Sequence, residues 1–341
     1  MLTAGELFSK EHSMKILIIG NPERYRKFCP DQILFERYEV VSCPLGSSDD
    51  DILKIGRDAE VIFADAIAKV SAYLIENMPK LRMIHSEGVA YNGIDIAAAS
   101  KKGVPVCNNK GQNAASVAEQ TLLLMLGVLR TAPAGHQAVL DGEQISRKEK
   151  LMLEGITDLA DCTVGLIGFG DIAKETALRL NAFGCRCLYY SRNRKSREVE
   201  ETCGVTYAAL HELLAGCDIV SLHMAVNAET MHFMNADRIG QMKDGARLIN
   251  TGRGELIENQ AMCEALLSGK LTAVGLDTIE PEPVRRENPV VQLAKRYPEK
   301  VFFSPHIGGV TTGSFKRMHA HIWENTERIA GGEQPDCVVN R

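Results

Sequence analysis

The segment at residues 163–173 places the strongest constraint on what this chain can fold into. It reads Thr-Val-Gly-Leu-Ile-Gly-Phe-Gly-Asp-Ile-Ala, a short apolar run that passes into closely spaced glycines and then into an amphipathic stretch. This order predicts a buried strand, a tight turn and a helix. Gly168 and Gly170 take the first two positions of a dinucleotide-binding fingerprint. The first turns the chain, and the second lets backbone amides approach a pyrophosphate at the helix N-terminus.

Strand-like and helix-like segments alternate along most of the chain. Short apolar runs rich in β-branched residues are followed by amphipathic stretches of helical length, which is typical of parallel βαβ units. We expect a first series of strands at residues 15–20, 38–43, 60–64, 81–85 and 104–108. We expect a second series at residues 163–168, 185–190, 218–223, 246–250, 271–277 and 301–304.

The length of the chain, 341 residues, exceeds what one hydrophobic core usually serves, so we expect two domains. An apolar helix at residues 116–130 separates the two series of strands, and the capping-box pattern of Ser116 and Glu119 predicts its start at Ser116. A last helix, residues 314–330, is expected to pack back on the first domain. The predicted fold class is α/β, with two Rossmann-like or flavodoxin-like parallel-sheet domains.

Composition and charge argue against several classes of protein. With 39 basic and 44 acidic residues the net charge is −5, so there is no basic excess for binding a nucleic acid. The longest strongly apolar run, residues 122–129, is far shorter than the roughly 20 residues that cross a bilayer, and no secretory signal is recognised. Ten cysteines without a Cys-x-x-Cys motif predict reduced thiols in a cytoplasmic protein. His319 and His321 point in different directions on a helix, so no metal site is predicted.

The end of the second strand after the glycine turn bears on the choice of cofactor. An acidic residue there binds the ribose hydroxyls of NAD, but this chain reads Ser191-Arg192-Asn193-Arg194-Lys195. No carboxylate repels a 2′-phosphate, which can accept a hydrogen bond from Ser191 and pair with Arg192, with Arg194 as a further cation. We therefore expect NADP to be preferred over NAD. The alternative is a solvated basic loop that binds nothing.

Three segments that follow strands of the second series carry reactive side chains. Arg253 lies in Asn-Thr-Gly-Arg-Gly, Glu282 in a proline-flanked loop, and His306 just before two glycines. Ligands of parallel sheets collect at the carboxyl ends of the strands, so we expect these side chains to converge near the cofactor. An arginine can hold a carboxylate, a histidine can exchange a proton near neutral pH, and a nearby carboxylate favours the imidazolium form.

These segments, with the glycine turn and the stretch 108–130, closely resemble the D-isomer-specific 2-hydroxyacid dehydrogenase family. The match is ordered from about residue 81 to residue 309, which is more specific than any single motif. The resemblance implies a discontinuous substrate-binding domain of residues 1–110 plus 310–341 and a dinucleotide-binding Rossmann domain of residues 111–309, with a cleft between them. It also implies a homodimer.

The resemblance assigns a role to each of the reactive residues. Arg253 binds the substrate, His306 donates the proton in the direction of reduction, and Glu282 holds and charges His306. It also implies further contacts with the cofactor. Asp171 and Ile172 are expected at the pyrophosphate, and His223, Met224 and Ala225 along the nicotinamide-side wall. The Thr251 carbonyl is expected beside the ring, Asp277 at the carboxamide, and Gly308 as a further cofactor contact.

Each catalytic assignment has a structural alternative. Arg253 can instead pair with a neighbouring glutamate on the surface, and His306 can be a histidine of the core. Glu280 is a near rival of Glu282, and the interval of five residues from Asp277 favours Glu282. The ordered match as a whole favours the catalytic interpretation.

The substrate side matches the family less regularly. Residues 86–95 correspond to a loop whose backbone amides bind the substrate carboxylate, so Gly88, Val89 and Ala90 are predicted substrate contacts. Ala90 replaces the usual second glycine, a change that backbone donors survive. Glu87 and Tyr91 leave the choice of substrate open.

The sequence therefore predicts an oxidoreductase that transfers hydride between NADPH and a small 2-oxoacid or D-2-hydroxyacid. A narrower alternative is a reductase specific for glyoxylate or hydroxypyruvate. An alternative from another class is a dinucleotide-sensing binding protein without turnover, because a few members of the family act as transcriptional corepressors and can keep the three residues.

Overall fold

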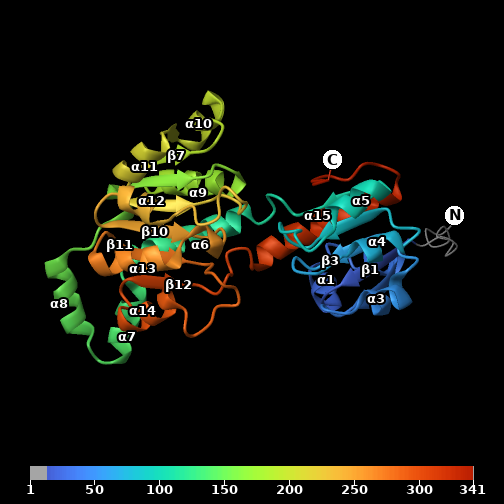
Figure 1. Cartoon of the computed structure of the whole chain (residues 1–341), viewed down its shortest axis with the longest axis horizontal. Coiled ribbons are helices and arrows are strands. Elements are labelled where there is room, and N and C mark those ends of the chain that lie inside the picture. Colours follow the sequence, from blue (N-terminus) through green and yellow to red (C-terminus); the bar gives the residue numbers. More distant parts are fainter. Residues whose placement is uncertain (1–13, 341) are drawn as a thin grey trace, which may run out of the picture. The chain divides into compact units, whose positions relative to one another are not determined.

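The computed structural model describes residues 14–340; residues 1–13 and Arg341 lie outside the described part. The chain divides into two compact units (Figure 1). Of the described residues, 14–113 and 312–340 form the first unit, and 114–311 form the second. Both units are parallel sheets with helices, so the predicted α/β class is confirmed.

The first unit is built on a five-stranded parallel sheet with the strand order β2-β1-β3-β4-β5. Its strands are β1 (Lys15–Ile19), β2 (Glu39–Cys43), β3 (Val61–Ala64), β4 (Met83–Ser86) and β5 (Val106–Cys107). Its helices are α1 (Pro22–Phe28), α2 (Ile33–Arg37), α3 (Asp49–Gly56), α4 (Ala72–Glu76), α5 (Ile96–Lys102) and α15 (Thr312–Ala330). This is the flavodoxin-like order, in which the direction of winding reverses between β1 and β3.

The central strands of this sheet are apolar on both faces because helices cover both faces. All four residues of β3 are buried, as are four of the five residues of β1. One side packs on α3, α4 and α5, and the other packs on Trp323 of α15, which is 1% exposed. The first unit therefore has a core of its own.

The second unit is built on a seven-stranded parallel sheet with the order β12-β11-β10-β9-β6-β7-β8. Its strands are β6 (Thr163–Ile167), β7 (Arg186–Tyr190), β8 (Val205–Tyr207), β9 (Ile219–Leu222), β10 (Ala246–Asn250), β11 (Leu271–Leu276) and β12 (Val301–Phe303). Its α-helices are α6 (Ala114–Leu129), α7 (Ala132–Leu140), α8 (Gln144–Glu154), α9 (Asp171–Ala182), α10 (Arg197–Cys203), α11 (Leu210–Gly216), α12 (Ala236–Gln241), α13 (Asn259–Ser268) and α14 (Pro289–Arg296). The order is that of a Rossmann sheet with one added strand, and the winding reverses between β6 and β9.

Two details differ from the sequence-based expectations. The capping box predicted at Ser116 is wrong, because α6 already begins at Ala114 and the Ser116 hydroxyl lies 2.9 Å from Thr311 Oγ1 instead of capping the helix. Strand β8 was not predicted: it has only three residues and lies at the edge of the sheet, where short pairing leaves a weak pattern.

Helices α7 and α8 form a hairpin that extends away from the sheet of the second unit (Figure 1). Neither helix has a buried residue. Within residues 14–340, no helix combines the length and the apolar character that crossing a membrane would require.

Candidate active site

The turn between β6 and α9 has the geometry of an anion-binding turn. Gly168 has φ +87°, and a Cβ atom there would lie 2.5 Å from the carbonyl oxygen of His223. Gly170 is the N-cap of α9 and makes no side-chain hydrogen bond to the first amides of the helix. A Cβ built at Gly170 meets no described atom within 4 Å. The residues therefore fit a pyrophosphate bound by backbone amides at a helix N-terminus.

The residues predicted around the pyrophosphate and the nicotinamide lie in two segments that follow β6 and β9, on either side of the switch point: Asp171, Ile172, His223, Met224 and Ala225. The backbone N–H of His223 donates to Ile167 at 2.7 Å, and its Nε2 lies 2.9 Å from the hydroxyl of Ser221. Burial lowers the pKa of His223 to about 4, so its ring is neutral near pH 7. His223 is therefore a buried, neutral side chain next to β9.

The predicted ribose-binding residues follow β7. The Ser191 hydroxyl donates to the Asn193 carbonyl at 2.7 Å, which closes a small turn. The Arg192 side chain is 80% exposed, and its one ion-pair partner within residues 14–340 is Glu229, at 3.5 Å. Such an exposed pair contributes little, so Arg192 is available for a phosphate.

Arg194 behaves differently from Arg192. Its Nε and Nη2 donate to Glu200 at 2.8 and 2.9 Å, and its guanidinium lies over the Tyr207 ring. Hydrogen bonds from Arg194 and Tyr189 lower the pKa of Glu200 to about 2. The structure thus pairs Arg194 with an acid on α10.

Asp277 holds the loop that carries His306. Its buried carboxylate accepts hydrogen bonds from the Ser304 hydroxyl at 2.5 Å, from the Ile307 amide at 3.0 Å and from the Gly308 amide at 2.9 Å. A Cβ at Gly308 would lie 3.0 Å from that carboxylate, so the close approach favours glycine. Sequence reasoning placed Asp277 at the nicotinamide and did not foresee this tether, which joins residues about 30 positions apart.

His306 and Glu282 are brought together. His306 Nδ1 lies 2.5 Å from Glu282 Oε1, and both side chains are partly exposed. The backbone of His306 has φ +55°, a conformation that side chains rarely adopt, and its N–H donates to the Asp277 carbonyl at 2.9 Å. The rival carboxylate, Glu280, lies instead 2.9 Å from His232 Nε2. The loop after β11 therefore carries two glutamates that each contact a different histidine, and the contact of Glu280 with His232 was not expected.

Arg253 lies just beyond β10. The side chain of Asn250 donates to the Arg253 carbonyl at 2.7 Å, which fixes the backbone of this loop. The guanidinium donates to the Gly252 carbonyl at 2.8 Å and makes no ion pair with any acid of the described chain. Thr251, the predicted neighbour of the ring, is buried with its hydroxyl 3.0 Å from Thr121. Arg253 therefore keeps donors for a ligand.

The predicted substrate loop lies in the first unit, directly after β4. The carbonyls of Gly88, Val89 and Ala90 all accept hydrogen bonds, between 2.6 and 2.9 Å long, from Asn109, Asn108 and Ser86 respectively. The backbone N–H groups of Val89 and Ala90 donate to no described residue. With its carbonyls bound and two amides unused, the loop presents donors suited to an anion.

The His pair on α15 has protein partners. His319 Nε2 lies 3.0 Å from Glu87, and His321 Nδ1 lies 3.0 Å from Asn109. In residues 14–340, no group of three or more histidines, cysteines or acids is arranged to hold a metal ion.

Comparison with known proteins identifies the family. Residues 122–308 match the family described as "D-isomer specific 2-hydroxyacid dehydrogenase, NAD binding domain". A glyoxylate reductase of Thermococcus litoralis is 34% identical over 310 residues, which cover 90% of this chain and 91% of that protein. The chain belongs to the D-isomer-specific 2-hydroxyacid dehydrogenase family. It is thus an NAD(P)-dependent oxidoreductase that acts on the CH–OH group of 2-hydroxyacids.

Other members of this dehydrogenase family agree in sequence and fold. A hydroxypyruvate reductase of Thermotoga maritima is 32% identical, over 88% of this chain and 94% of its own length. The crystal structure of a D-isomer-specific 2-hydroxyacid dehydrogenase from Polaromonas has a TM-score of 0.81 at 27% identity, over 96% of this chain and all of that one. A glyoxylate reductase from Paecilomyes thermophila has a TM-score of 0.78 at 29% identity, over 94% and 97% of the two chains. The family resemblance inferred from the sequence is confirmed.

Proposed function

We propose that this dehydrogenase reduces a small 2-oxoacid to the D-2-hydroxyacid, with His306 as the proton donor to the C2 oxygen. The contact between His306 and Glu282 carries the proposal. Nδ1–H donating to the carboxylate fixes the tautomer and the orientation of the ring, which leaves Nε2 to face the substrate. Transfer of a proton by a positioned histidine contributes about 10² to 10⁴ to the rate.

Arg253 is assigned to the substrate carboxylate and the adjacent carbonyl. The fixed backbone and the unpaired guanidinium support this role, since a planar arginine can bind a carboxylate through two N–H groups. In the first unit, the unused amides of Val89 and Ala90, with Gly88 beside them, are assigned to binding a substrate carboxylate. When bound, the reduced nicotinamide supplies the hydride to C2.

Activity with a panel of 2-oxoacids tests the function. Glyoxylate and hydroxypyruvate are the first candidates, because relatives at 34% and 32% identity bear the names glyoxylate reductase and hydroxypyruvate reductase. We expect oxidation of the reduced dinucleotide with these acids or with pyruvate. Binding of dinucleotide without turnover of any 2-oxoacid would instead favour the sensing protein.

NADPH is the proposed preferred form of the cofactor. No acidic residue stands at the position directly after β7, where Ser191 and the exposed Arg192 lie instead. Arg194 contributes less than the sequence suggested, because Glu200 already pairs with it. The double substitution Ser191→Asp with Arg192→Ala is expected to reverse the ratio of kcat/KM for NADPH and NADH. An unchanged ratio would contradict the cofactor assignment.

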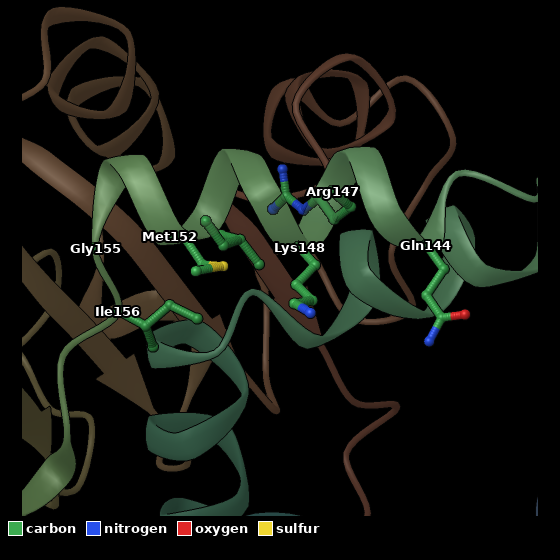
Figure 2. A pocket seen from close by; sticks show the side chains of 7 residues that line it. Gln144, Arg147, Lys148, Met152, Gly155 and Ile156 are labelled. Carbon is green, nitrogen blue, oxygen red and sulfur yellow. The ribbon is translucent and has the colours of Figure 1, made fainter.

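We also propose a homodimer in which a second copy covers the α7–α8 hairpin. Figure 2 shows Lys148, Met152 and Ile156 facing the same side of α8, along a groove of about 450 Å³. Several large apolar side chains of the two helices are exposed, namely Val139, Leu140, Ile145, Met152 and Leu153, and apolar side chains that gather on a surface are typical of interaction sites. A self-complementary patch is the usual basis of a twofold dimer.

The oligomeric state tests this part of the proposal. Met152→Lys with Leu153→Lys is expected to convert a dimer to a monomer in light scattering. Leu267→Lys, which removes an apolar side chain that is 60% exposed on α13, is the matched control. A wild-type monomer would contradict the homodimer.

The cytoplasmic location stays a prediction, to be checked by fractionation.

A further inference from the structure

The carboxyl edge of the first unit's sheet holds a charged cluster that the proposed reaction does not use. It consists of Arg24 on α1, Asp65 after β3 and Glu87 after β4. Strands β1 and β3 are the two between which the winding of this sheet reverses. In open parallel sheets, ligands bind outside the carboxyl ends of the strands at such a switch point. The cluster therefore lies where this fold usually receives a ligand.

The members of the cluster are held in fixed positions. Arg24 Nε donates to Glu87 Oε1 at 2.6 Å, and Nη2 contacts Glu87 Oε2 and, at 2.5 Å, Asp65 Oδ2. His319 Nε2 lies 3.0 Å from Glu87 Oε1. Burial on its own would lower the pKa of Arg24, but the bonds and charges of Glu87 and Asp65 raise it, so Arg24 stays charged. These bonds give the cluster one arrangement.

The cluster has an excess of negative charge. Two carboxylates face one guanidinium, which leaves a formal charge of −1. His319 contacts this cluster through Nε2 alone, and its buried Nδ1 has no hydrogen-bond partner among the described residues. The Glu87 side chain is only 5% exposed, and a charge so buried is screened far less than a surface charge.

The cluster adjoins the predicted substrate loop. Glu87 directly precedes Gly88, and a Cβ at Gly88 would lie 2.7 Å from the side chain of Ala66, the residue after Asp65. The Glu87 carbonyl is bound by Asn109 at 2.8 Å, so side chain and backbone are both anchored. The unused amides of Val89 and Ala90 follow within three residues. The charged cluster and the predicted carboxylate-binding amides therefore meet in one short segment of the chain, residues 87–90.

We propose that Glu87, held by Arg24 and backed by Asp65, selects the charge class of the substrate. This inference rests on the proposed function. The −1 charge disfavours 2-oxoacids that carry a second carboxylate or a phosphate, and it leaves acids with a short uncharged side chain unaffected. Like charges several ångströms apart in a poorly screened site lower binding by about tenfold. Glu87 acts here as a specificity-determining residue and takes no part in proton or hydride transfer.

Substrate selectivity in the full-length enzyme tests this inference. The kcat/KM values for glyoxylate and pyruvate are compared with those for oxaloacetate and 2-oxoglutarate, in the wild type and in Glu87→Gln. We expect the wild type to favour the first pair by at least about tenfold and the substitution to raise the relative kcat/KM of the dicarboxylates by about tenfold. The dissociation constant of NADPH should not change, because the predicted cofactor residues lie in the second unit.

Two further variants keep the test decisive. Asp65→Asn removes the second carboxylate with less disturbance, since its side chain is 15% exposed, and it should shift selectivity in the same direction. Glu60→Gln removes the same charge at the amino end of β3, where Glu60 pairs with Arg82, and should leave selectivity unchanged.

If the wild type already prefers dicarboxylates, Arg24 binds their second carboxylate and the inference is wrong. Equal ratios in the wild type, Glu87→Gln and Asp65→Asn also overturn it, while the proposed function stands. A wild type that is inactive with every 2-oxoacid would contradict both the proposed function and this inference.

Discussion

The two units share a parallel architecture but place their polar groups differently. In the second unit, reactive side chains sit on short loops directly after strands, and the nearest strand identifies each of them: Arg253 after β10, Asp277 after β11 and His306 after β12. In the first unit, buried polar side chains form a continuous network beneath the carboxyl edge of the sheet: His85, Glu87, Asn109, His319, His321 and Asn325. Both units therefore carry polar side chains at this edge, on the loops after the strands in the second unit and in a buried network in the first.

The difference has a physical basis in how each group is stabilised. The contact between His306 and Glu282 is partly exposed, so water can solvate both side chains. Buried groups such as Glu87 and His85 are held by hydrogen bonds, because an unpaired buried polar group costs about 1 to 3 kcal/mol. Substitutions in the second unit's loops should therefore alter rates, and substitutions in the first unit's network should alter selectivity or stability.

The largest expected effect is that of His306→Asn. Loss of the proton donor should lower kcat by about 10² to 10⁴, with little change in the binding of NADPH. His232→Asn is the matched control, since His232 also contacts a glutamate, at 2.9 Å, in the same unit. Steady-state kinetics with the best 2-oxoacid measures both. A similar loss in both variants would show that the two His–Glu pairs are not functionally distinct.

A second prediction separates folding from ligand binding within the glycine turn. Gly168→Ala forces a side chain into a φ of +87° and against the His223 carbonyl, so it should lower the free energy of unfolding by about 2 to 4 kcal/mol. Gly170→Ala meets no such contact and should leave stability nearly unchanged while weakening NADPH binding about tenfold. Circular dichroism and dinucleotide titration measure the two effects. Equal destabilisation by both substitutions would contradict this division of roles.

Sequence reasoning worked where structure is local. Buried parallel strands form continuous apolar runs, so nearly every strand was located to within a residue or two. The glycine turn was recognisable because the strand, the two glycines and the helix are consecutive in sequence. The contact of His306 with Glu282 spans only 24 positions and lies in two loops that follow neighbouring strands, β11 and β12.

The interactions that escaped prediction are those between distant parts of the chain. Glu87 contacts Arg24, 63 positions away in the sequence, and His319, 232 positions away. No sequence pattern near any of these residues predicts the contacts. The helix start at Ala114 also depends on contacts that the capping pattern does not encode. The α7–α8 hairpin has no buried face within the described chain, so the periodicity that reveals other helices gives no inward direction here.

The smallest expected effect concerns acid stability of the first unit. His85 is fully buried, donates from Nδ1 to the Ser86 carbonyl at 2.8 Å and accepts at Nε2 from Asn325 at 3.1 Å, an arrangement that fits only the neutral ring. Burial lowers the pKa of His85 to about 3, below its ordinary value of about 6.5. The unfolded chain therefore takes up a proton as the pH falls below about 6.5 while the folded unit does not. The stabilisation is complete above that pH and is lost towards acid, by about 2 kcal/mol at pH 5.

The single tryptophan makes this loss measurable in the first unit of the full chain, since Trp323 lies buried there. Denaturant unfolding followed by its fluorescence at pH 7.5 and pH 5 should show the decrease, and His85→Asn should remove most of it. His211→Asn, on the exposed face of α11 in the second unit, should leave the decrease unchanged. If wild type and His85→Asn lost equal stability, the acid sensitivity would lie elsewhere, and the buried network of the first unit would differ from the loops of the second only in position.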